Sequence, residues 1–179
     1  MSAEMINNHK KVVFLDVDGT MVNDRGEIPE STKEAVRRAK ANGHKMVVCT
    51  GRSRFQIYDE LLELGFSGIV GAAGVFVIAD VRLTGNMHLT EEPWKNPRNE
   101  KLLYYNAPFP VAKVHADLEP YFDTVAISLE GMGEYAGEIG IKGINKATGM
   151  ERYLKAAGIA REDSIAVGDG PNDLQMMEY

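Results

Sequence analysis

The chain has 179 residues, of which 44% are hydrophobic and 26% are charged, and its net charge is −6. This length suits one good-sized domain or a core with a small insert, and the composition is typical of a globular protein. The acidic balance argues against binding to nucleic acid or to an anionic membrane. No apolar stretch approaches the roughly 20 residues of a membrane span, and residues 1–11 lack the apolar centre of a secretory signal. The single cysteine, Cys49, excludes an internal disulfide and lies in an apolar run, so we expect a buried, inert thiol in a cytoplasmic protein.

The first third of the chain alternates short apolar runs with helical patterns. Apolar runs without polar alternation are typical of buried strands in a parallel sheet, whereas apolar residues three and four apart indicate amphipathic helices. The expected order is a strand at 12–15, a helix at 29–43, a strand at 45–49, a helix at 53–64 and a strand opening at 69–70. This order predicts an α/β fold with a doubly wound parallel sheet.

The middle of the chain loses this rhythm. Residues 75–78 and 81–89 resemble a hairpin, strands are expected at 102–105 and 124–129, a helix at 111–120, and hairpins or loops in the glycine-rich stretch 131–143. We interpret residues 78–138 as a small inserted α+β cap, so that residues 1–77 and 139–179 form the core.

The regular pattern returns near the end of the chain. A helix is expected at 145–157 with Gly158 as its stop, followed by a strand at 164–167 and the start of another helix at 174–179. The last strand leads into Gly168-Asp169-Gly170-Pro171-Asn172-Asp173. A superficial likeness of this segment to a dinucleotide-binding glycine loop is contradicted by its aspartates, which would repel a pyrophosphate.

Polar residues follow three of the predicted strands. Asp16 and Asp18 end the first, Thr50-Gly51-Arg52 ends the second, and Asp169 with Asp173 ends the last. Because the carboxyl ends of parallel strands share one edge, these groups should converge, giving acids for Mg²⁺ and a hydroxyl, turn amides and basic groups for a phosphate. Lys142 or Lys146 could neutralise phosphoryl charge. The residue types therefore predict metal-assisted phosphoryl transfer.

Other interpretations of the first acidic pair remain at this stage. Asp16 and Asp18 could simply solvate a turn, or the Gly19 turn could form a phosphate cradle, which two carboxylates would oppose. An EF-hand loop fits poorly, because Met21 occupies the position where that loop needs glycine and a strand leads into it.

Four segments in this order make the chain resemble a haloacid dehalogenase (HAD) superfamily phosphatase of the Cof-type, subfamily IIB group. They are Asp16-Val17-Asp18-Gly19-Thr20, Thr50-Gly51-Arg52, Lys142-Gly143-Ile144-Asn145-Lys146 and Gly168-Asp169-Gly170-Pro171-Asn172-Asp173. The resemblance covers about two-thirds of the chain and implies a Rossmann-like core, with Mg²⁺-dependent hydrolysis of phosphate monoesters of small metabolites, such as sugar phosphates or phosphorylated cofactors.

The resemblance also implies roles for individual residues. Asp16 would be the nucleophile that becomes an aspartyl-phosphate, and Asp18 the acid and base that protonates the leaving alcohol and then activates water. Lys146, a better match than Lys142, would shield the nucleophile from the incoming phosphate. The phosphate ligands would be Thr50, Gly51, Arg52 and Asn172, and the metal ligands would be Asp16, the Asp18 carbonyl, Asp169 and Asp173. Asp18 favours a phosphatase over a dehalogenase, which needs no acid there.

Two departures from the family pattern bear on function. The insert is short for this subfamily, whose caps shape the leaving-group pocket. Family members also continue beyond the last motif, so we expect the strand at 164–167 to form a sheet edge that either a longer chain or a second subunit would cover. The alternatives to a monomeric or homodimeric phosphatase are a phosphate- or metal-binding protein without turnover and a phosphotransferase or mutase.

Overall fold

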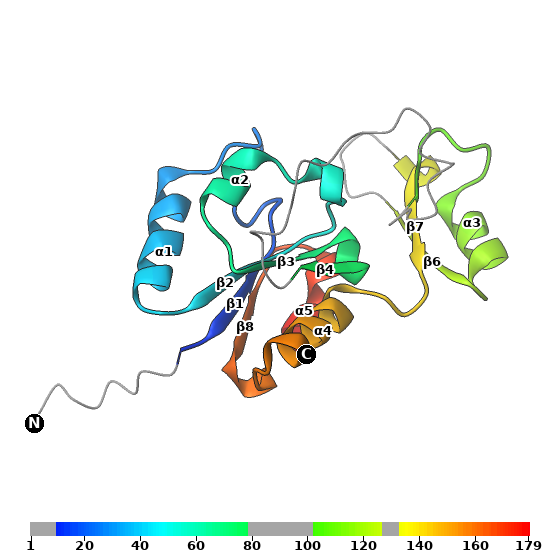
Figure 1. The fold of residues 1–179 in the computed structure, drawn as a ribbon. Coiled ribbons are helices and arrows are strands. Elements are labelled where there is room, and N and C mark those ends of the chain that lie inside the picture. Colours follow the sequence, from blue (N-terminus) through cyan, green and yellow to red (C-terminus); the bar gives the residue numbers. More distant parts are fainter. Residues whose placement is uncertain (1–9, 79–101, 127–132) are drawn as a thin grey trace, which may run out of the picture.

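The computed structural model describes residues 10–78, 102–126 and 133–179, which form two separate sheets (Figure 1). The larger sheet has the strand order β4-β3-β2-β1-β8, and the smaller has the order β5-β7-β6. The α/β fold class predicted from the sequence is confirmed. No helix in the described part of the chain is long and apolar enough to cross a membrane.

The larger sheet is parallel except at one edge. Strands β1 (Val12–Leu15), β2 (Lys45–Cys49), β3 (Gly68–Gly71) and β8 (Ser164–Val167) run parallel, and β4 (Phe76–Ile78) pairs antiparallel with β3. The sequence predicted β4 as half of a hairpin with residues 81–89, but those residues lie outside the described part, and β4 pairs with β3. Strand β8 pairs with β1 and forms the other edge, as expected.

Helices cover both faces of this sheet (Figure 1). Helices α1 (Glu30–Ala41) and α2 (Asp59–Glu63) pack on one face, where Val36 and Leu61 join one apolar cluster. Helices α4 (Lys146–Ala157) and α5 (Leu174–Glu178) pack on the other, where Tyr153 sets its ring edge-on to Phe14 at 5.5 Å between centroids. The core therefore lies between the sheet and two helical layers, and it leaves the carboxyl edge of the strands free for the site.

One predicted helix is shorter than expected. In place of a helix over 53–64, a 3₁₀ turn at Arg54–Gln56 precedes α2. The Gln56 side chain accepts hydrogen bonds from the Ser53 amide and hydroxyl, which closes this turn on itself. Ile57 and Tyr58 then adopt extended backbone angles, so the two turns cannot merge into one helix. The helices predicted before and after it are confirmed, with Asn145 as the N-cap of α4 and Gly158 as its left-handed C-cap.

The smaller sheet comes from the predicted insert. Strands β5 (Leu102–Tyr104) and β6 (Phe122–Ala126) flank β7 (Gly137–Ile141), both antiparallel to it, and α3 (Val111–Leu118) packs against β6. The stretch 131–143, expected as hairpins or loop, thus contributes the central strand. The predicted domain limit at 138/139 falls inside β7. The division into core and cap stays a prediction.

Candidate active site

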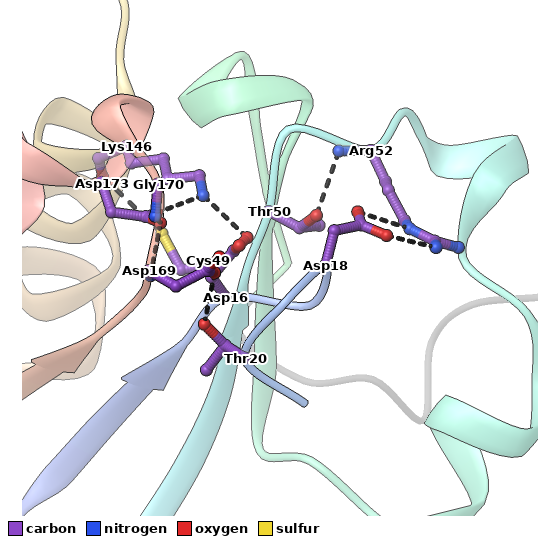
Figure 2. Close-up of polar contacts among 10 residues, drawn as sticks. All are labelled: Asp16, Asp18, Thr20, Cys49, Thr50, Arg52, Lys146, Asp169, Gly170 and Asp173. Atoms are coloured by element: carbon purple, nitrogen blue, oxygen red, sulfur yellow. Dashed lines mark hydrogen bonds and ion pairs between the residues drawn. The ribbon is translucent and has the colours of Figure 1, made fainter. Parts of the chain in front are cut away.

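The loop after β1 sends its two aspartates in different directions. The Asp16 side chain is buried and faces Lys146, whereas Asp18 is exposed and faces Arg52 (Figure 2). Asp16 continues the pairing with β8 through its amide, which donates to the Val167 carbonyl at 3.0 Å. The chain then turns, and the amides of Met21 and Val22 both donate to the Val17 carbonyl. In an ideal strand the two side chains would share a face, so this turn separates them.

Lys146 links Asp16 in the first motif to Asp173 in the last. Its side chain is inaccessible to solvent, and Nζ lies 2.7 Å from Asp16 Oδ1 while also donating to Asp173 Oδ1 (Figure 2). Lys146 is the first residue of α4, so the Asn145 cap, which accepts from the Thr148 amide, sets where this side chain starts. Lys142 lies elsewhere, because its ammonium binds the backbone carbonyl and the carboxylate of Glu119. Of the two candidate lysines, the fold brings only Lys146 to Asp16.

The segment after β8 brings two more carboxylates. Asp173 is completely buried, and its Oδ2 accepts from the amides of Asp169 and Gly170 at 3.1 and 3.0 Å. Asp169 accepts a hydrogen bond from the Thr20 hydroxyl at 2.9 Å. The sequence placed Thr20 in the first motif without a role, and its hydroxyl now links that motif to the last one. Such a link between motifs 149 residues apart carries no local sequence signal.

Gly19 makes this convergence possible. Its φ is +79°, in the left-handed region, and a Cβ at this position would overlap the Asp169 carboxylate. Only glycine both adopts this turn and lets Asp169 approach the backbone. The glycine of the first motif is therefore explained by the position of an aspartate from the last one.

The loop after β2 lies beside Asp16 and Asp18. Thr50 is fully buried, its amide donates to the Val70 carbonyl at 2.9 Å, and its hydroxyl accepts from the Arg52 amide at 3.1 Å. This contact caps the local turn, and the hydroxyl proton remains available as a donor. Gly51 faces the side chain of Asn172, since a Cβ at Gly51 would lie 3.8 Å from Asn172 Nδ2. Thr50, Gly51 and Asn172, predicted to hold phosphate, are thus brought to one side of the site.

A strained turn supports this loop from behind. Ala72 and Ala73 have φ values of +48° and +53°, a region that costs an alanine about 1–2 kcal/mol. Their amides donate to the carbonyls of Arg52 at 2.8 Å and Thr50 at 3.0 Å. The sequence showed only a small-residue stretch after a strand, and neither alanine was assigned a role. The hydrogen bonds indicate that the turn holds the Thr50–Arg52 loop in place.

The buried charges of the site are unbalanced. Burial raises the pKa of Asp16, and the nearby Lys146 ammonium opposes this effect without cancelling it. Burial would lower the pKa of Lys146, but attraction and hydrogen bonds from Asp16 and Asp173 raise it. The two pKa values are raised for different reasons, burial for Asp16 and the two neighbouring carboxylates for Lys146. Because these carboxylates share a single ammonium, the site carries a surplus of negative charge.

This surplus fits a hard cation. Asp16, Asp169 and Asp173 each offer a carboxylate oxygen, and these oxygens lie within 4.8 Å of one another. Oxygen donors of this kind suit Mg²⁺, which takes one or two carboxylates and completes its shell with water and substrate phosphate. Both oxygens of Asp173 already accept hydrogen bonds, one from Lys146 and the other from two backbone amides. Asp173 is therefore better arranged to orient the cluster than to bind a metal with both oxygens.

The chain is similar to known proteins over most of its length. A family model described as haloacid dehalogenase-like hydrolase matches residues 13–97 and 86–179. The phosphoglycolate phosphatase of Nitrosopumilus maritimus is 28% identical over 188 residues, covering 94% of this chain and 80% of that protein. The 5-amino-6-(5-phospho-D-ribitylamino)uracil phosphatase of Bacillus subtilis is 26% identical over 225 residues, covering 94% and 83%.

Solved structures share the fold. The subclass IIB sugar phosphatase BT4131 superposes with a TM-score of 0.69 at 20% identity, covering 93% of this chain and 84% of that one. A protein from Geobacillus kaustophilus superposes with a TM-score of 0.73 at 21% identity, covering 93% and 83%. At such identities the likeness shows the fold alone.

Proposed function

The chain belongs to the haloacid dehalogenase-like hydrolases, as a Cof-type phosphoric monoester hydrolase, and from this premise we propose that it cleaves phosphate monoesters of small metabolites through an aspartyl-phosphate on Asp16. The observation that carries the proposal is the pairing of a buried carboxylate with a fully buried ammonium, Asp16 with Lys146 at 2.7 Å. A structural ion pair would need no second and third carboxylate beside it, whereas a nucleophile that meets a phosphate dianion needs positive charge close by.

The first half of the reaction is transfer of the phosphoryl group to the protein. An Asp16 carboxylate oxygen attacks phosphorus, the bond from phosphorus to the leaving oxygen breaks, and Asp18 gives its proton to that oxygen so that a neutral alcohol departs. Lys146 lowers the repulsion between Asp16 and the phosphate. The Thr50 hydroxyl, the Gly51 amide and the Asn172 side chain hold the non-bridging oxygens in place.

The second half returns the protein to its starting state. Asp18, now a carboxylate, takes a proton from water as the water oxygen attacks phosphorus, and the bond between phosphorus and the Asp16 oxygen breaks to release inorganic phosphate. Both halves use Asp18, once as acid and once as base. The separation of Asp16 from Asp18 at the turn gives each carboxylate its own task.

We further propose Mg²⁺ as the cofactor. Asp16, the Asp18 carbonyl and Asp169 would hold it, with Asp173 as a further ligand or orienting group, and the ion supplies positive charge for the phosphoryl oxygens. Sugar phosphates or phosphorylated cofactors are the proposed substrate class. Similar proteins support this class, because they include phosphatases of phosphoglycolate, of a phosphoribitylamino-uracil and of sugar phosphates.

The test is hydrolysis of p-nitrophenyl phosphate by the purified chain with Mg²⁺ and with EDTA, using Asp16→Asn as the control. We expect Mg²⁺-dependent release of nitrophenolate by the wild type and none above background by the variant. Equal rates for the two folded proteins would contradict the proposal. A panel of phosphorylated metabolites then identifies the substrate, and addition of alcohols as acceptors distinguishes hydrolysis from phosphotransfer.

A further inference from the structure

Arg52 holds the carboxyl group of Asp18 with two parallel hydrogen bonds. Its Nε lies 3.0 Å from Asp18 Oδ2, and its Nη2 lies 2.6 Å from Oδ1 (Figure 2). A guanidinium that meets both oxygens of a carboxylate in this way fixes its plane as well as its position. The sequence had predicted a phosphate contact for Arg52, which is the alternative that the experiment below tests. The described geometry directs this side chain to the proposed acid and base.

Arg52 is in turn held by its own loop. Its Nη1 donates to the Gln56 carbonyl at 3.0 Å, and its guanidinium carbon lies 5.2 Å from the centre of the Tyr58 ring. Both backbone groups of Arg52 are also hydrogen-bonded, because its amide donates to the Thr50 hydroxyl and its carbonyl accepts from the Ala72 amide. These contacts would remain if Asp18 moved. The fold, and not the ion pair, therefore sets the orientation of Arg52.

Asp18 lacks comparable packing. Its side chain is 60% exposed, at the start of the turn that Gly19 makes, so burial does not select one rotamer. An ionised carboxylate has about four acceptor positions, and the guanidinium takes two of them. The contact therefore joins an exposed carboxyl group to a guanidinium that the fold holds in place.

We propose that Arg52 is a positioning residue, which fixes the Asp18 carboxyl group for proton transfer to the leaving alcohol. The inference deepens the proposed function and rests on it. General acid catalysis contributes about 10²–10⁴-fold to a rate, and a displacement of about 1 Å can cost 10²-fold. Loss of the two-point contact should therefore matter only where the leaving oxygen needs a proton.

Dependence on the leaving group distinguishes a positioning role of Arg52 from phosphate binding and from support of the loop. A nitrophenolate is a stable anion that departs without a proton, whereas an alkoxide does not. If Arg52 bound the phosphate, its loss would weaken every phosphate ester and inorganic phosphate alike. If Arg52 only stabilised the loop, its loss would lower the rates with all esters together.

The experiment compares Arg52→Lys with the wild type on p-nitrophenyl phosphate, phenyl phosphate and the best alkyl phosphate of the metabolite panel. Lysine keeps the charge but cannot form the two-point contact. The measured quantity is kcat/KM, because it covers the steps through release of the alcohol and omits hydrolysis of the aspartyl-phosphate. We expect a loss of about 10–100-fold for the alkyl ester, less than about 3-fold for p-nitrophenyl phosphate, an intermediate loss for phenyl phosphate, and an unchanged inhibition constant for inorganic phosphate.

A double-mutant cycle completes the test. In an Asp18→Asn background, Arg52→Lys should cause no further loss with the alkyl ester, since nothing remains for Arg52 to position. Equal losses with all three esters, a weakened inhibition constant for phosphate, or additive losses in the double mutant would overturn the inference. Should Arg52→Lys fail to fold, Arg52→Gln serves in its place. A wild type that hydrolyses none of the esters would instead refute the proposed function.

Discussion

Replacing the proposed nucleophile should stabilise the protein while it removes activity. In Asp16→Asn, a neutral amide of the same shape takes the place of a buried carboxylate and can still accept a hydrogen bond from Lys146. We expect the variant to be inactive, and to be more stable than the wild type in EDTA. The reason is that burial removes the Asp16 carboxylate from water, and the ammonium that it shares with other carboxylates does not offset this cost.

The magnitude follows from the distances. At an effective dielectric constant of about 20, the Lys146 ammonium at 2.7 Å attracts Asp16 by about 6 kcal/mol. Asp169 and Asp173, each with an oxygen within 4.8 Å, repel it by about 3.5 kcal/mol apiece, so attraction and repulsion nearly cancel. The cost of removing the carboxylate from water remains, and we expect its relief to stabilise Asp16→Asn by about 1–2 kcal/mol, or roughly 2–8 °C in Tm.

The pH dependence has a definite sign. Burial raises the pKa of Asp16 above its ordinary value of 3.8, so the unfolded chain loses this proton first, and stability falls as the pH rises through the folded pKa. Asparagine does not titrate. The advantage of Asp16→Asn should therefore be small near pH 4 and should grow as the pH rises.

The assay is urea denaturation followed by circular dichroism, with EDTA and then with Mg²⁺. Asp18→Asn is the matched control, because it breaks an exposed ion pair worth no more than about 1 kcal/mol. Mg²⁺ should stabilise the wild type more than Asp16→Asn, since one proposed ligand is weakened. A variant clearly less stable than the wild type in EDTA would show that the ion pair with Lys146 outweighs the repulsion, and would refute the reasoning.

Three further outcomes follow from the structure. Lys146→Met leaves two buried carboxylates without their ammonium and should cost about 3–5 kcal/mol in urea denaturation. Lys142→Met breaks an exposed pair and should change the stability far less, so similar losses for the two variants would contradict the burial argument. Gly19→Ala should weaken Mg²⁺ binding in a calorimetric titration, because its Cβ would displace Asp169. Gly26→Ala is the control and should leave the Mg²⁺ affinity unchanged, since Gly26 has a similar φ of +75° but open space around it. Burial raises the pKa of the Cys49 thiol to about 12, so an aromatic disulfide reagent at pH 8 should label it only in urea. Rapid labelling of the folded protein would show instead that the thiol is accessible.

Strand β8 forms an exposed edge of the larger sheet. Strand β8 pairs only on the β1 side in the described sheet, and its Ile165 and Val167 side chains are 46% and 40% exposed. Exposed edge strands with apolar side chains favour association.

Local patterns in the sequence determined most of the core. Apolar runs marked β1, β2, β3 and β8, and the Asn145 and Gly158 signals marked the limits of α4, because these features depend on residues only a few positions apart. The helix expected at 53–64 was wrong, since the side-chain contact between Gln56 and Ser53 ends the first turn. In the insert, the glycine-rich composition predicted hairpins or loop where the structure has β7. This strand forms because it pairs with β5 and β6 and not because of its own composition.

The sequence by itself determined which chemical groups are present and that parallel strand ends would bring several of them to one edge. Only the tertiary structure decided how they pair: Lys146 and not Lys142 beside Asp16, Thr20 on Asp169, and Arg52 on Asp18. The physical reason is that partners 34 to 149 residues apart meet through the packing of α4 and the turn at Gly19, and neither leaves a local sequence signal. Acidic and basic residues can be counted in the sequence, but their distances and burial, which set their pKa values and their tasks, belong to the fold.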